Sequence, residues 1–239
     1  MRRLWMSLLL LVPVLALIAP VAASAATTAA SRPAAATAAA QPAASKGFIK
    51  AVQQRLNSLG YYAGPADGTI GTSTLEAIWA FEEVQGLPTH SYVDKAFTVR
   101  LQHPRAPKVL DRAAGANRVE VHLRSGYLVL WQNNKVRLIS HISPGGGYYF
   151  CNPGGGCGYA ITPTGNFKTL VYMPGWVTVP LGEMYNPVFF IGTAYAIHGD
   201  TDVPLAPVSH GCVRVPMDIA AFFHKLVKVP GEPVIVRNA

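Results

Sequence analysis

The stretch RVEVHLRSGYLVLWQNNKVRLISHI, residues 118–142, decides the fold of the larger part of this chain. It holds three apolar runs of strand character, at residues 119–123, 127–131 and 136–142. Turn residues separate the runs, first Ser125-Gly126 and then Asn133-Asn134. Alternation with a period of two around such turns is typical of consecutive antiparallel strands. The sequence therefore predicts a β-rich domain that begins near residue 117.

Downstream of this stretch the same texture continues to the C-terminus. Further short apolar runs predict strands at residues 167–172, 176–180, 188–197 and 234–236. One helix is predicted over 216–227, with Pro216 at its first turn. Residues 117–239 are thus expected to form a mainly β domain of the sandwich or open-barrel kind, with one late helix.

Upstream, residues 46–103 have helical rather than strand spacing. Val52, Leu56 and Leu59 recur at helical intervals, and Gly60 ends that pattern. A second helix is expected to start at Thr72 or Ser73 and to end near Gly86, with Glu76 completing a capping box from Ser73. This segment predicts a small all-α helical domain. Residues 104–116, rich in Pro and Gly, predict a linker to the β domain.

The first residues predict export. Arg2 and Arg3 precede an uncharged run from Leu4 to Ala23, and Ala23-Ser24-Ala25 supplies the small residues of a cleavage site. Residues 1–25 are therefore expected to be a signal peptide, with an uncleaved membrane anchor as the alternative. Residues 26–45, almost wholly Ala, Thr, Ser and Pro, predict a disordered linker.

The composition limits the partners. The formal net charge is +8, yet only 13% of the residues are charged, and there are 22 Gly and 19 Pro. No basic run or Arg/aromatic stripe is present, so no nucleic acid is expected as a partner. The excess of positive charge fits attraction to anionic lipid head groups or acidic wall polymers. Solubility alone is an equally good reason for it.

Three cysteines in an exported chain leave one unpaired. Cys151 and Cys157 flank the flexible loop Asn-Pro-Gly-Gly-Gly, so a disulfide between them is expected outside the cytoplasm. Redox sensing or metal binding by the pair is the alternative. Cys212 is then the single thiol.

The surroundings of Cys212 suggest nucleophilic catalysis. It follows Ser209-His210-Gly211, and His198-Gly199 stands fourteen residues before it. A thiol attacks a carbonyl efficiently only as thiolate, so an imidazole within reach serves as its base. The alternatives are a buried inert cysteine with structural histidines, or a metal site. The metal donors would be His198, Asp200, Asp202, His210 and Cys212, but their spacing matches no zinc signature.

A family resemblance favours catalysis. His198-Gly199, the run Ser209-His210-Gly211-Cys212-Val213-Arg214 and the upstream Thr162-Pro163-Thr164-Gly165-Asn166-Phe167 are similar to the L,D-transpeptidase family with its YkuD-type catalytic domain. The resemblance covers about residues 117–239. It implies a mixed β-sandwich-like fold and attack on an L,D bond in peptidoglycan stem peptides. No metal is expected, because a thiol–imidazole site does not need one, and no cofactor is expected either.

The same resemblance assigns roles to the residues of the motif. Cys212 would be the nucleophile and His198 the proton acceptor and donor, oriented by the backbone carbonyl of Gly199. The oxyanion and substrate set would be Ser209, His210, Gly211 and Arg214, with the backbone amide of Cys212. Arg214 would shape the loop or meet a substrate carboxylate. The choice of His198 over His210 as base comes from the family alone.

The helical segment resembles the small peptidoglycan-binding domain. The resemblance rests on residues 52–62, on Asp67-Gly68-Thr69-Ile70-Gly71, and on Thr74 and Phe81, although Glu82 stands where that family often has Gln. It implies recruitment to wall glycan. A helical spacer without a ligand is the alternative.

The sequence as a whole predicts an exported cysteine acyltransferase at the cell wall or the outer face of the cytoplasmic membrane. It would crosslink peptidoglycan stem peptides through a thioester. An L,D-carboxypeptidase using the same site and a non-catalytic wall-binding protein are the rival functions.

Overall fold

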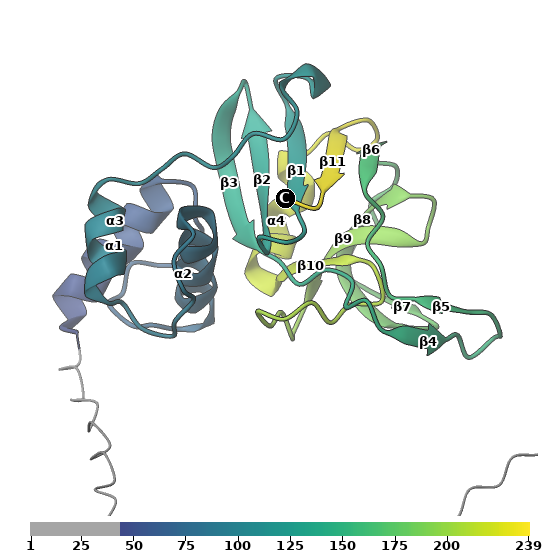
Figure 1. Cartoon of the computed structure of the whole chain (residues 1–239), viewed down its shortest axis with the longest axis horizontal. Coiled ribbons are helices and arrows are strands. Elements are labelled where there is room, and N and C mark those ends of the chain that lie inside the picture. The colour runs from purple at the N-terminus through teal and green to yellow at the C-terminus, as the bar shows by residue number, and fades with distance from the viewer. Residues whose placement is uncertain (1–43) are drawn as a thin grey trace, which may run out of the picture. The chain divides into compact units, whose positions relative to one another are not determined.

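Three helices form the first part of the described chain: α1 (Lys46–Ser58), α2 (Thr72–Gln85) and α3 (Lys95–Gln102) (Figure 1). The computed structural model describes residues 44–239. The predicted signal peptide and all but the last two residues of the predicted 26–45 linker lie outside the described residues. Among residues 44–239, no helix combines the length and the apolar character needed to cross a membrane.

Local sequence explains where the helices start and stop. The Ser45 side chain caps α1 by accepting from the Phe48 amide, and Asp94 caps α3 by accepting from Phe97. Gly86 ends α2 as expected, in the left-handed conformation with φ of 66°. The predicted capping box is wrong: the N-cap of α2 is Gly71, without a side-chain cap. Helix α3 was not predicted.

Ser73, the expected cap residue, has a different contact. Its hydroxyl donates to Asp218 of α4 (Met217–Leu226), a helix far away in the sequence. The Ser73 hydroxyl therefore connects the helical part of the chain to the β-rich part. Local sequence does not encode such a long-range contact.

The β-rich part contains two main sheets. The first has the order β3-β2-β1-β11-β6 and the second the order β10-β9-β8-β7. Their bounds are β1 (Arg118–His122), β2 (Tyr127–Gln132), β3 (Lys135–His141), β6 (Gly165–Lys168), β7 (Trp176–Val179), β8 (Gly182–Ile191), β9 (Tyr195–Asp200), β10 (Val213–Pro216) and β11 (Pro233–Arg237). The pairs β1/β11 and β9/β10 are parallel and the other pairs antiparallel, which gives the expected mixed sandwich with one late helix.

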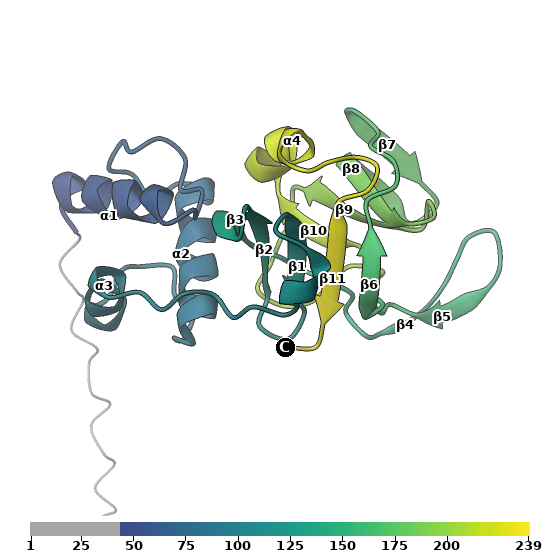
Figure 2. The ribbon, with the colours of Figure 1, turned by 90° about the horizontal axis from the view of Figure 1, so that it is seen from above.

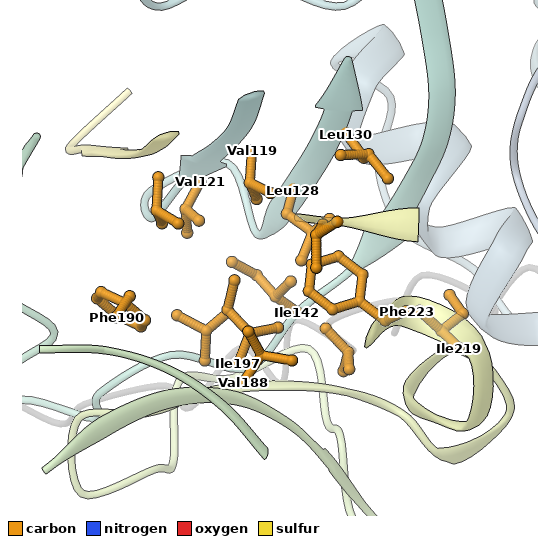
Figure 3. Packing of buried hydrophobic residues seen from close by; sticks show 14 of the residues in the cluster. Val119, Val121, Leu128, Leu130, Ile142, Val188, Phe190, Ile197, Ile219 and Phe223 are labelled. Carbon is orange, nitrogen blue, oxygen red and sulfur yellow. The ribbon is translucent and has the colours of Figure 1, made fainter. Parts of the chain in front are cut away.

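The main core lies between these two sheets and α4 (Figure 3). It includes Val119, Val121, Leu128, Leu130, Ile142, Val188, Phe190, Ile197, Ile219 and Phe223. Burial of this apolar surface away from water is the dominant favourable contribution to folding. Helix α4 contacts β8, β9 and β10 and lies at one side of the sandwich (Figure 2).

The outer face of the first sheet is covered as well. Leu128 and Leu130 of β2 enter the main core, whereas Tyr127, Val129 and Trp131 point to the opposite face. There they join a second core with helix residues Leu56, Ile78, Phe81 and Phe97. The helical segment and the sheet therefore share one apolar cluster.

Residues 104–116 pack against the same face rather than projecting from it. The segment contains one turn of 3-10 helix, η1 (Arg112–Ala114). Its Leu110 and Asp111 amides donate to the buried carboxylate of Glu120, which also accepts from Arg118 and from the Trp131 indole. This network satisfies a charge that would be costly to bury alone.

Two strand predictions need correction. The run 188–197 is not one strand, because a turn at residues 192–194 separates β8 from β9. The predicted strand 167–172 is only partly regular, since β6 ends at Lys168. The Gly-rich loop near residue 154 is the tip of an unpredicted hairpin, β4 (Tyr149–Cys151) with β5 (Cys157–Tyr159).

Candidate active site

Parallel strands β9 and β10 place His198 and Cys212 on one face of the second sheet. In their register Ile197 lies beside Val213 and His198 beside Arg214. Cys212 directly precedes β10. Because side chains alternate along extended backbone, His198, Cys212 and Arg214 project from the face that does not enter the main core. Ile197 and Val213 project into that core.

The imidazole of His198 is buried and held by its neighbour. Its Nδ1 lies 2.9 Å from the carbonyl oxygen of Gly199. A carbonyl only accepts, so Nδ1 carries the proton and Nε2 is left as the basic nitrogen. Burial lowers the pKa of His198, while the Gly199 carbonyl and the charge of Asp200 act in the opposite direction. The ring is therefore neutral at neutral pH.

Gly199 is required by packing as well. A Cβ at this position would lie 2.6 Å from the Cβ of Ala220 on α4. A larger residue would push α4 away from β9, so glycine follows His198 for a reason independent of the imidazole.

Cys212 is partly exposed and lies against an apolar cluster. The cluster contains Met173, Val177, Val179, Met184, Phe189 and Ala196. The sulfur of Cys212 is 3.7 Å from the Ala194 carbonyl oxygen. Burial raises the pKa of the Cys212 thiol, against a hydrogen bond from the Ala196 backbone and the charge of Arg214. The resting group is a neutral thiol, so its activation requires a base.

The loop before Cys212 is fastened by two hydroxyl groups. The Ser209 hydroxyl donates to the Cys212 carbonyl oxygen at 2.6 Å and accepts from the Gly211 amide at 2.9 Å. The Thr162 hydroxyl donates to the Gly211 carbonyl oxygen at 2.8 Å and accepts from the Gly145 amide at 2.9 Å. These contacts fix the backbone around the thiol.

Gly211 has the backbone conformation that this loop needs. Its φ is +138°, and a Cβ there would lie 2.7 Å from the Tyr195 ring and 2.9 Å from the Ile161 carbonyl oxygen. Only glycine fits both requirements. Its amide donates to the Ser209 hydroxyl, so that amide already has a hydrogen-bond acceptor.

Arg214 forms an ion pair beside the site. Its Nε is 3.0 Å from Oδ2 of Asp200, and one of its terminal nitrogens donates to the Asp202 carbonyl oxygen at 3.2 Å. Both contacts connect the Arg214 side chain to the end of β9 and the start of the loop that follows it.

His210 packs against aromatic side chains at the start of the β4/β5 hairpin. Its ring meets those of Phe150 and Tyr148 edge-on, with centroids 4.8 and 5.5 Å apart. Cys151 and Cys157 pair across the hairpin and form the expected disulfide. Burial and the charge of Arg214 lower the pKa of His210.

The metal alternative finds no cluster of donors. Nowhere in residues 44–239 do three His, Cys, Asp or Glu side chains gather as a metal site would require. Of the donors considered, Asp200 pairs with Arg214 and His210 packs against aromatic rings.

Two parts of this chain match known protein families. Residues 116–236 match the L,D-transpeptidase catalytic domain family YkuD. The chain belongs to the L,D-transpeptidase family. Residues 45–101 match a peptidoglycan binding domain family. Together these matches support peptidoglycan as the partner of this L,D-transpeptidase and a location at the cell wall.

Solved structures of L,D-transpeptidases resemble this chain to different degrees. An L,D-transpeptidase from Xylanimonas cellulosilytica is 30% identical, with a TM-score of 0.73 over 80% of this chain and 93% of that one. One from Stackebrandtia nassauensis is 20% identical, with a TM-score of 0.47 over 80% and 90%. One from Mycobacterium smegmatis is 22% identical, with a TM-score of 0.41 over 51% and 58%. Only the first is similar enough to bear on the fold. A comparison with curated proteins found no match.

Several residues around this L,D-transpeptidase site were not singled out from the sequence. The sequence points to Asp200 only as a possible metal donor, and it gives no sign of a role for Tyr148, Phe150 or Ser143. The Ser143 hydroxyl donates to the Ala206 carbonyl oxygen at 2.8 Å. The Gly-Gly-Gly run at residues 154–156, between the two cysteines of the disulfide, is the signal in the sequence for the β4/β5 hairpin. No local pattern marks Ser143, because its partners lie more than sixty residues away.

Proposed function

We propose that this L,D-transpeptidase forms a thioester on Cys212 and transfers the acyl group between peptidoglycan stem peptides. The observation that carries the proposal is the shared face of His198, Cys212 and Arg214, with the basic Nε2 of His198 left available. A neutral thiol beside a neutral imidazole is the starting state for proton transfer coupled to attack.

In the first half-reaction, Cys212 attacks the carbonyl carbon of the third stem residue. His198 Nε2 takes the thiol proton as the carbon–sulfur bond forms. The amides of Cys212 and His210 would stabilise the oxyanion. When the peptide bond breaks, the imidazolium returns the proton to the leaving amine, and D-alanine departs.

In the second half-reaction, an amine of a neighbouring stem attacks the thioester. His198 accepts a proton from that amine and returns it to the departing thiolate, so the enzyme is regenerated. Water as acceptor would give an L,D-carboxypeptidase instead. The apolar cluster beside Cys212 supports transfer, because it limits access of water to the thioester.

The domain division is part of the same proposal. Residues 46–103 would bind wall glycan, 104–116 would connect, and 117–239 would carry the chemistry. Residues 1–25 would direct export and 26–45 would tether the enzyme, whose net positive charge would favour anionic wall polymers.

One experiment tests the function. The purified enzyme is incubated with tetrapeptide-stem muropeptides and the products are weighed by mass spectrometry. Crosslinked dimers that are absent with Cys212→Ala support transpeptidation, and tripeptides alone would support the carboxypeptidase. If neither product forms while sacculi still bind the protein, the enzymatic proposal is wrong and the chain is a wall-binding protein.

A further inference from the structure

A buried histidine connects helix α2 to the loop that carries Cys212. His141, the last residue of β3, is 1% exposed. Its Nδ1 is 2.8 Å from Oε1 of Glu83 on α2. Its Nε2 is 3.2 Å from the carbonyl oxygens of both Val203 and Pro204. These two residues lie in the loop between β9 and β10, which ends at Cys212.

The hydrogen-bond partners of His141 determine how many protons it and Glu83 hold together. The carbonyl oxygens only accept, so the Nε2 of His141 must carry a proton. A proton must also lie between Nδ1 and the Glu83 carboxyl group, because two lone pairs would otherwise face each other. The pair is therefore an imidazolium with a carboxylate, or a neutral imidazole with a carboxylic acid. Both descriptions hold the same number of protons.

The surroundings favour retention of that proton. Burial raises the pKa of Glu83 to about 7, although the hydrogen bond and charge of His141 oppose the shift. Burial alone would lower the pKa of His141, but the bond and charge of Glu83, with smaller effects of the Pro204 carbonyl and Glu76, raise it. The other acidic groups facing the pair are Glu76 and Glu82 on α2 and, through Glu76, Asp218 on α4.

His141 begins a row of contacts along the loop. Two residues later, the Ser143 hydroxyl donates to the Ala206 carbonyl oxygen and accepts from the Val208 amide. The Pro144 carbonyl then accepts from the Ser209 amide. Residues 141–144 thus hold successive points of the loop up to the Ser209 that braces Cys212. His141 is the first of these points, and it is the one in contact with the helical segment.

We propose that Glu83 is a positioning residue for Cys212: by fixing His141, helix α2 holds the loop from Val203 to Cys212 in its reactive arrangement. This inference rests on the proposed function and extends it, since residues 46–103 then contribute to the rate of acylation as well as to wall binding. From the sequence, that segment is expected to recruit the enzyme to wall glycan or to act as a spacer without a ligand.

The protons bound by Glu83 and His141 determine how their effect on the loop changes with pH. Folded Glu83 and His141 both bind protons more tightly than in the unfolded chain, so their contribution to stability falls as pH rises through the neutral range. After the shared proton is lost, His141 has one N–H left. That N–H donates either to Glu83 or to the loop carbonyl oxygens. A charged carboxylate is the stronger acceptor, so the loop is the side that is released.

The test compares variants of the whole chain. Glu83→Ala removes the contact and leaves Nδ1 without a partner. Glu83→Gln preserves it, because the amide can donate to Nδ1 of a neutral His141 whose Nε2 still donates to the loop. Gln85→Ala is the matched control: Gln85 lies on the same helix and is 3% exposed, but it binds the backbone of Arg105 and not the loop.

Two measurements are made, hydrogen exchange over residues 201–214 and the rate at which a carbapenem acylates Cys212. Glu83→Ala should accelerate exchange in the loop and slow acylation roughly 10-fold to 100-fold near pH 6.5, as expected for a misplaced reactive group. Gln85→Ala should do neither. The ratio of the wild-type rate to the Glu83→Gln rate should fall as pH rises from 6 to 9.

Two results would overturn the inference. One is unchanged loop exchange in Glu83→Ala, which is decisive whatever chemistry Cys212 performs. The other is a Gln85→Ala variant that loses acylation as much as Glu83→Ala does. A wild-type enzyme that no carbapenem acylates would count against the proposed function instead, while the exchange measurement would still decide the role of Glu83.

Discussion

The Nδ1 atom of His198 lies 2.9 Å from the carbonyl oxygen of Gly199, the next residue of β9. The bond is local, so it forms wherever β9 forms. It determines which ring nitrogen is basic, and it does so without any carboxylate partner. For His210 the contacts are of another kind, with the rings of Tyr148 and Phe150.

The two histidines should therefore respond differently to removal. His198→Ala should slow acylation of Cys212 by a carbapenem by roughly 10²–10⁴-fold, because the thiol then lacks a base. His210→Ala should cost less, since its backbone amide stays. Acylation is followed by intact mass, with thermal melting as the folding check. A folded His210→Ala variant without acylation, beside an active His198→Ala variant, would exchange the two roles.

Arg214 should tune the reactivity of the thiol through its charge. Arg214→Met removes a positive charge that lowers the pKa of Cys212, so the pKa should rise and alkylation by iodoacetamide should shift to higher pH. Asp200→Asn breaks the same ion pair but keeps the arginine charge, so it should cause no upward shift. The pH dependence of the alkylation rate is the measurement. Equal upward shifts in both variants would mean that loop geometry, not charge, is responsible.

Cys212 should be the only thiol that reacts in the oxidised protein, because Cys151 and Cys157 form a disulfide. Peptide mapping after mild alkylation should find the label on Cys212 alone. After reduction, all three cysteines should be labelled. Equal labelling of Cys151 or Cys157 before reduction would contradict the pairing in the purified protein.

Much of this fold could be predicted because its signals are local. The alternation over residues 118–142 identifies three strands, and Asn133 and Asn134 both have the positive φ (51° and 57°) that their hairpin turn needs. The Ser-His-Gly-Cys-x-Arg motif likewise identifies the site, since a tight loop and a short strand carry all its members.

What the sequence could not predict depends on distant contacts. Ser73 fits a capping box locally, yet its hydroxyl binds Asp218 on α4. Glu120 and His122 are polar residues of an alternating strand and would be expected to face water, but both are buried. Residues 104–116 contact Glu120, and the Tyr127 ring stacks on His122. Glu83 and His141 are 58 residues apart, so no spacing rule connects them.

The Thr162 hydroxyl should contribute measurably to the site. Thr162→Val keeps the shape but leaves the Gly211 carbonyl and the Gly145 amide without their partner. An unsatisfied buried polar group costs about 1–3 kcal/mol, so unfolding free energy should fall by that amount and acylation should slow. Thr164→Val, on the exposed surface nearby, is the matched control and should change neither. Denaturant unfolding measures the stability. Two variants that behave alike would show that Thr162 does not brace the loop.

The shared core makes a last prediction about truncation. Tyr127, Val129, Trp131 and Ile139 are at most 6% exposed because helix residues such as Leu56, Ile78, Phe81 and Phe97 cover them. A chain that begins at residue 117 would expose this face to water, and it would also lose the amides of Leu110 and Asp111 that bind Glu120. Since an exposed apolar patch of this kind favours association, the truncated protein should melt at lower temperature and self-associate, as seen by calorimetry and light scattering. Replacing Val129 and Ile139 by Thr in the truncated chain should restore solubility without restoring the melting temperature. A truncated chain that stays monomeric and melts like the whole protein would contradict the shared core and indicate that residues 117–239 fold on their own.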